Sequence, residues 1–98
     1  MKKNIIQEKS FSFAHSIITL FKKLQEQREY IISKQVVRSA TSVGANVEEA
    51  IAGQSRKDFI NKLSISLKEA RETRYWLRLL QESELTSIDV SEYQKAAL

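Results

Sequence analysis

Few residues in this sequence could carry out catalysis. His15, between Ala14 and Ser16, is the only histidine, and cysteine is absent. A lone imidazole has no second one with which to share a metal ion, and the chain lacks the motifs of di-iron bundles, phosphate loops, zinc sites and Ser-His-Asp hydrolases. Glu48 and Glu49 are adjacent, so on a helix they point about 100° apart and form no working carboxylate pair. The sequence therefore predicts a protein that is not an enzyme and has no cofactor or metal.

Cationic side chains are concentrated on one predicted helix in the second half of the chain. Arg71, Arg74 and Arg78 lie within about 60° of one another at helical spacing. Lys68 and Tyr75 lie farther round on the outer face of the same helix. Guanidinium groups can hold phosphates and a tyrosine can stack a base. We call these five residues the basic strip, and they are candidates for nucleic-acid binding.

Acidic residues on the same helix leave a second interpretation open. Glu69, Glu72 and Glu82 are near enough in sequence to pair with the arginines. The chain holds 16 Lys and Arg against 12 Asp and Glu, a net charge of +4, and these charges are interspersed. Since charged residues usually solvate exposed faces, the strip is either a phosphate-binding surface or an ordinary salt-bridged one.

A second group of polar residues lies beside the apolar stripe of an earlier predicted helix. This polar shoulder consists of Arg38, Ser39, Ser42, Asn46 and Glu49. The serines can bond to preceding carbonyls of their own helix. Alternatively, Arg38 and Asn46 bond across to another chain, which would also explain the small residues around Gly44.

An aromatic residue and an isoleucine extend this candidate interface. Trp76 falls about 100° from the apolar seam of its helix, near Ile65. It is either a residue at the edge of the core or an anchor in a subunit interface, where tryptophan is enriched. We expect the polar shoulder, Ile65 and Trp76 to form a subunit interface.

Four helical segments must position these residues. The chain has no proline and two glycines, which favours an all-α fold. A first helix over residues 10–27, with Ser10 as its N-cap, carries two adjacent apolar stripes and should be buried against more than one neighbour. The stripes are Phe11, Ala14, Ile18, Phe21 and Phe13, Ile17, Leu20, Leu24.

The remaining segments follow the same periodicity. A second helix over residues 31–52 ends at Gly53. A third begins at the capping residue Ser55. Its seam is Phe59, Leu63, Ser66, Ala70, Thr73, Leu77 and Leu80. After a lapse over residues 83–87, Val90, Tyr93 and Ala97 begin a short fourth helix.

Short connections imply antiparallel neighbours. We therefore predict one domain over residues 1–98, an up-down-up-down antiparallel four-helix bundle with a short fourth helix. A domain of this size has a modest core, and self-association would add to the surface that it buries. The start of the chain is a poor signal peptide because Gln7, Glu8 and Lys9 interrupt it. No run approaches the ~20 apolar residues of a membrane span, and we expect a cytoplasmic protein with no membrane contact.

One stretch resembles a known family. The run Arg38-Ser39-Ala40-Thr41-Ser42-Val43-Gly44-Ala45-Asn46-Val47-Glu48-Glu49-Ala50, followed by the segments 58–60 and 65–73, is similar to the bacterial four-helix-bundle family first noticed in intervening sequences of large-subunit rRNA genes. Its relatives include the accessory variability determinant of diversity-generating retroelements. The resemblance covers about residues 10–80. It implies a homopentameric ring or barrel and, for the members associated with retroelements, binding of nucleic acid and reverse transcriptase through a basic surface.

Two functional hypotheses follow from these observations. The first is a homo-oligomeric helical adaptor that binds RNA, DNA or a nucleic-acid enzyme such as a reverse transcriptase. The second is a structural assembly module with no nucleic-acid role, whose partner would be another protein.

Overall fold

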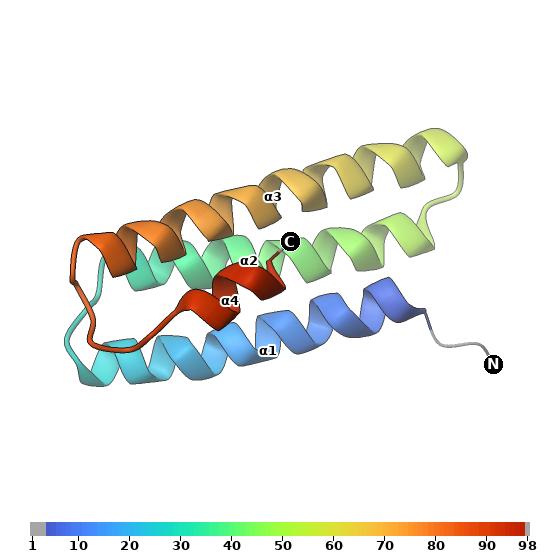
Figure 1. Ribbon diagram of the computed structural model, residues 1–98. Coiled ribbons are helices and arrows are strands. Elements are labelled where there is room, and N and C mark those ends of the chain that lie inside the picture. Colours follow the sequence, from blue (N-terminus) through green and yellow to red (C-terminus); the bar gives the residue numbers. More distant parts are fainter. Residues whose placement is uncertain (1–3, 98) are drawn as a thin grey trace.

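Three long helices and one short helix make up the molecule. The computed structural model describes residues 4–97. They form α1 (Ile5–Glu26), α2 (Ile32–Ala52), α3 (Arg56–Glu82) and α4 (Ser91–Ala96). Within the described residues α2 packs against both α1 and α3, and α4 returns along the open side between α1 and α3 (Figure 1). The prediction of an all-α up-down-up-down bundle with a short fourth helix is confirmed. Residues 1–3, which entered the signal-peptide argument, lie outside the described residues.

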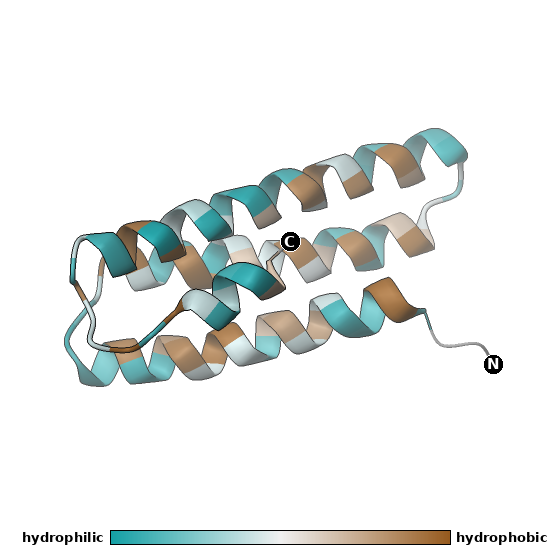
Figure 2. Cartoon of the chain, in the orientation of Figure 1, coloured by the Kyte–Doolittle hydropathy of each residue, from teal (hydrophilic) through white to brown (hydrophobic). Residues whose placement is uncertain are grey.

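The core forms where the apolar stripes of the four segments meet. Its fully covered side chains include Ile17, Leu20 and Leu24 of α1, Val36 and Ala40 of α2, Leu77 and Leu80 of α3, and Val90 just before α4. Hydrophilic and hydrophobic residues alternate along the three long helices (Figure 2). Burial of these aliphatic groups, at ~1.5–3 kcal/mol for each side chain, is the main favourable term in the stability of the bundle.

The predicted start of the first helix is wrong by five residues. The helix begins at Ile5, and the side chain of Asn4 accepts a hydrogen bond from the backbone N–H of Gln7 at 3.0 Å. Ser10 is buried inside the helix, where its hydroxyl donates to the carbonyl of Gln7 at 3.1 Å. Asn4 therefore takes the N-cap role, to which asparagine and serine are about equally suited.

The first stripe of α1 is largely uncovered by its own chain. All four residues of the second stripe are buried, as expected. By contrast, Phe11 is 67% exposed and Ile18 is 39% exposed. Within the described residues the second stripe is therefore fully buried, whereas the first stripe, in which Ala14 and Phe21 are half-buried, is covered only in part.

The predicted seam of α3 is buried over its second half. Ser66, Thr73, Leu77 and Leu80 are covered. Phe59 is 43% exposed, so its assignment to the core is wrong, and Leu63 and Ala70 are half-buried. The reason is the length of the neighbours, because α4 lies beside the last turns of α3 and ends before reaching the first ones (Figure 1).

The C-terminal ends of α1 and α2 are each followed by a short loop. Arg28 follows α1 in the left-handed conformation, with φ 63°, and its N–H donates to Gln25 O while that of Glu29 donates to Leu24 O. This pattern is a Schellman motif without glycine. Gly53 ends α2 at the predicted position, but its φ of −60° is not left-handed.

Candidate nucleic-acid interface

The basic strip lies on one exposed flank of α3. All five of its side chains are exposed. At ~100° per residue they span about 120° of the helix surface. Leu67 and Ala70 line a cavity on the open side of the bundle. Arg71 lies one turn after Leu67 and Arg74 lies one turn after Ala70, so the strip borders that side. The structure therefore presents the predicted residues together on one surface.

The acidic residues of α3 divide between two partners. Arg38 of α2 forms ion pairs with Glu69, at 3.5 Å, and with Glu72. Arg78 pairs with Glu82 at 2.6 Å. The hydrogen bond and the charge of Glu82 raise the pKa of Arg78 above its ordinary value, so this arginine stays charged.

Two arginines of the strip have no such neutralisation. Among residues 4–97, neither Arg71 nor Arg74 forms an ion pair. The salt-bridged interpretation therefore describes Arg78 alone. The sequence analysis did not predict that Arg38 would pair with Glu69 and Glu72. These partners lie 31 and 34 residues from Arg38, so no spacing within one helix indicates the contact.

Tyr75 adds an aromatic surface beside these cations. It is 58% exposed. Its ring meets that of Trp76 edge to face, with the ring centroids 5.0 Å apart. Such a contact limits the motion of an exposed ring without covering it. The strip thus combines uncompensated positive charge with a ring surface open to stacking.

The polar shoulder forms hydrogen bonds within its own chain. Ser39 is fully buried, donates to the carbonyls of Gln35 and Val36, and accepts from the hydroxyl of Thr73 at 2.7 Å. The amide nitrogen of Asn46 donates to the carbonyl of Ser42 at 2.8 Å. For Ser39 the local interpretation is therefore sufficient.

The other residues of the predicted interface lie along the outer groove between α2 and α3. Arg38 bridges the two helices, Glu49 is exposed near the end of α2, and Ile65 is 40% exposed on α3. Trp76 is half-buried, packs against the core, and donates from its indole nitrogen to Glu72 at 3.1 Å. The structure places these residues on the same side of the α2–α3 pair but at different heights along it, and their part in a subunit contact stays a prediction.

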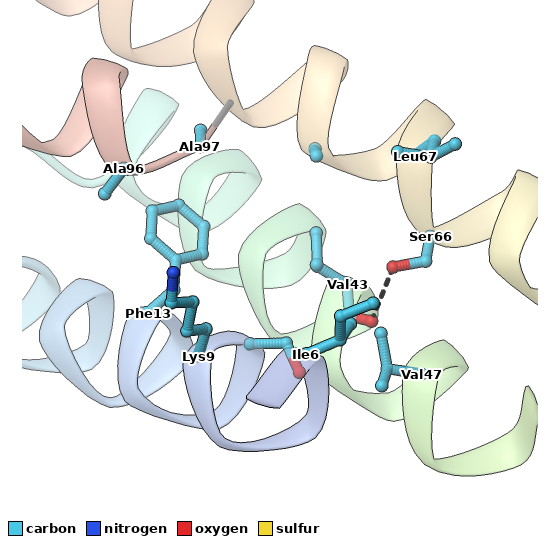
Figure 3. Close-up of a pocket in the computed structure, with 11 residues that line it drawn as sticks. Ile6, Lys9, Phe13, Val43, Val47, Ser66, Leu67, Ala96 and Ala97 are labelled. Atoms are coloured by element: carbon cyan, nitrogen blue, oxygen red, sulfur yellow. Dashed lines mark hydrogen bonds between the residues drawn. The ribbon is translucent and has the colours of Figure 1, made fainter. Parts of the chain in front are cut away.

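An apolar cavity of about 240 Å³ opens between α1, α2 and α3 beyond the end of α4. Ile6, Phe13, Val43 and Leu67 line it, and Ser66 donates to the carbonyl of Val43 at 2.9 Å (Figure 3). Lys9 is the one charged side chain of its described lining, which holds no carboxylate, imidazole or thiol. These residues offer no acid-base pair for catalysis.

No other described feature resembles a catalytic or metal centre. His15 is exposed on α1. Over residues 4–97 there is no group of three or more His, Cys, Asp or Glu side chains placed to hold a metal ion. In the same part of the chain, none of the helices has the length and apolar character that crossing a membrane requires.

Comparison with known proteins agrees with this architecture. A solved structure from Bacteroides thetaiotaomicron VPI-5482, described as a protein of unknown function from the S23 ribosomal protein family, is 47% identical. The match covers 95% of this chain and 88% of that one, with a TM-score of 0.89. No curated protein matches the chain. The family model for the 23S rRNA-intervening sequence protein matches residues 2–97. The chain therefore belongs to the 23S rRNA-intervening sequence protein family.

Proposed function

We propose that this protein is a non-enzymatic, self-associating adaptor that binds nucleic acid through the basic strip of α3. The observation that carries the proposal is the diversion of Glu69 and Glu72 to Arg38, which leaves Arg71 and Arg74 exposed without an ion pair among the described residues. Exposed guanidinium groups on one flank attract phosphates, and each contact releases counterions. The family is named for intervening sequences of 23S rRNA, which supports RNA as the first ligand to test.

Self-association would make a weak contact useful. One chain offers about three phosphate contacts, for which counterion release predicts a salt slope near −2.7 and roughly a 40-fold loss of affinity between ~50 and ~200 mM salt. Several copies linked together raise the effective concentration of the remaining strips. Binding should therefore depend strongly on salt, show little sequence preference and require assembly.

We expect the variant R71Q/R74Q/R78Q to lose binding to labelled RNA and DNA in fluorescence polarisation, because it removes the phosphate contacts. Its matched control is K22Q/K23Q/R28Q, which removes the same three charges from the end of α1. Loss in the first variant alone supports the strip. Equal loss in both would reduce the effect to net charge, and loss in the control alone would move the site to α1.

The alternative function is a structural assembly module without a nucleic-acid role. The Arg78–Glu82 pair favours it, since one cation of the strip is already compensated. Under this alternative the parent protein shows no polarisation change with RNA or DNA even at ~50 mM salt, where phosphate contacts are stronger than at ~200 mM.

A further inference from the structure

A groove between α1 and α3 continues beyond the end of α4. The short helix α4 covers one half of the open side of the bundle and ends at Ala96 (Figure 1). The apolar cavity described above lies at this point, between Phe13 of α1 and Leu67 of α3, with Ala96 and Ala97 at one end (Figure 3). Beyond it, Leu67 is 62% exposed and Ile6 is 59% exposed. We call this uncovered half the α1–α3 groove, which runs over residues 6–13 of α1 and 56–74 of α3.

A second stripe of α3 with coiled-coil spacing faces this groove. Its members follow one another in alternating steps of four and three residues: Arg56, Ile60, Leu63, Leu67, Ala70, Arg74, Leu77 and Gln81. The stripe reaches α4 at Gln81, whose side-chain oxygen accepts a hydrogen bond from Gln94 at 3.0 Å, and Leu77 before it is fully buried. Such spacing keeps one face of a helix turned toward a partner helix over several turns. The stripe that meets α4 therefore continues uncovered for about 27 Å, the length of residues 56–74 in an α-helix.

Positive charge borders the apolar floor of the groove. Arg56 and Arg74 lie at the two ends of the uncovered stripe, and Lys9 lines the cavity from α1. Among residues 4–97, none of these three cations forms an ion pair. An occupant with carboxylates along its flanks would therefore meet opposite charges on both sides of the groove.

The carboxylates of this part of α3 lie away from the groove. Glu69 and Glu72 bond to Arg38 of α2, and Asp58 lies beside Gly53 at the end of α2. At ~100° per residue, all three acidic side chains are about 140–160° from the middle of the stripe. The groove flank of α3 over residues 56–74 thus contains aliphatic side chains and arginines only.

We propose that the α1–α3 groove binds an acidic amphipathic helix of another protein, which lies in line with α4 and completes the fourth position of the bundle. The packing of α4 supports a helix as the occupant, because α4 contacts the later part of the same stripe. The cations at the border favour Glu and Asp over Lys and Arg on the flanks of that helix. Recognition would use apolar anchors at steps of three and four residues. About 14 residues, or four turns, would fill most of the groove.

Fluorescence anisotropy of a labelled synthetic peptide tests this inference. The probe is a helix of about 14 residues with Leu at steps of three and four and Glu on both flanks. Its controls are the same peptide with Lys in place of Glu, and a peptide of the same composition whose order removes the apolar stripe. The parent protein should bind the Glu peptide at least about tenfold more tightly than either control, because only this peptide matches both the apolar floor and the charge of the groove.

Two variants of the protein locate the site. Leu67→Glu should weaken binding of the Glu peptide about tenfold or more, since it places a carboxylate in the apolar contact. Its matched control is Leu85→Glu, in the loop after α3, where Leu85 is 45% exposed, and it should bind as the parent does. The variant K9E/R56E should reverse the preference from the Glu peptide to the Lys peptide. Helicity by circular dichroism checks that the variants fold.

The outcomes separate this inference from the proposed function, because Lys9, Arg56 and Leu67 lie outside the basic strip. A parent that does not prefer the Glu peptide, or a folded Leu67→Glu variant that binds it as the parent does, overturns the inference. A Leu67→Glu variant whose mass by light scattering falls below that of the parent would assign the groove to a second copy, and would overturn it too. Binding of RNA by the parent is judged by its own assay.

Discussion

Glu29 shows how one side chain can fix a helix start that has no ordinary cap. It is buried although it is charged, and its carboxylate oxygens accept hydrogen bonds from the backbone N–H groups of Ile31, Ile32 and Ser33 at 3.1, 2.6 and 3.0 Å. Ile31, at the N-cap position, has no side chain able to do this. The positive end of the α2 dipole favours the negative charge there.

We predict that Glu29→Ala lowers the free energy of unfolding by about 1–3 kcal/mol, because buried N–H groups lose their acceptors. Glu29→Gln should lose less, since its amide oxygen can accept some of the bonds. Urea denaturation with an unchanged m-value would measure both. Glu26→Ala, at an exposed position one turn earlier, is the control, and a Glu29→Ala curve that overlays it would contradict the assigned role.

At the scale of the helix, the backbone conformation at the end of α1 is strained, and a single substitution would relieve the strain. Arg28 adopts a left-handed conformation that costs residues with a Cβ about 1–2 kcal/mol. Glycine avoids this steric penalty, but it loses more backbone entropy on folding, which offsets part of the gain. We therefore predict that Arg28→Gly raises the free energy of unfolding by about 0.5–1 kcal/mol. Lys23→Gly removes the same charge inside α1 and should lower it by about 1 kcal/mol. Thermal melts of the two variants should move in opposite directions.

The packing of α3 gives a matched pair of core substitutions. Leu77 is fully buried, whereas Leu63 is half-buried on the same seam. We predict that Leu77→Ala costs about 2–5 kcal/mol because it leaves a cavity, and that Leu63→Ala costs less because solvent already reaches the site. Equal costs in urea denaturation would mean that the first half of α3 is covered, as it would be if this part also lay against another chain.

Local spacing predicted the helices well because each carries a stripe that repeats over several turns. The helix end at Ala52 was identified from one glycine, Gly53. The start of α1 was missed because Asn4 and Ser10 are both good caps, and only the tertiary structure places Ser10 against Gly44 in the interior. Spacing also cannot tell which stripe of an amphipathic helix is covered, so Phe11 and Phe59 were assigned to buried positions.

At the scale of the whole molecule, the sequence located the candidate surfaces but not their internal connections. The basic strip was predictable because its residues share one helix. The pairing of Arg38 with Glu69 and Glu72, and that of Ser39 with Thr73, joins helices far apart in sequence. These contacts decide which arginines remain uncompensated and which serine is inaccessible. They depend on the packing of α2 against α3, which no spacing within one helix reports.

The short connections between consecutive antiparallel helices have a consequence for how quickly the chain finds its fold. Contacts between neighbours in sequence close small loops, and such topologies fold within microseconds to milliseconds. The sequence contains no proline, so the prolyl isomerisation that delays many proteins by ~10–100 s is absent. A newly made chain would therefore complete its own fold early, and under the proposed self-association the meeting of copies would be the slow, concentration-dependent step.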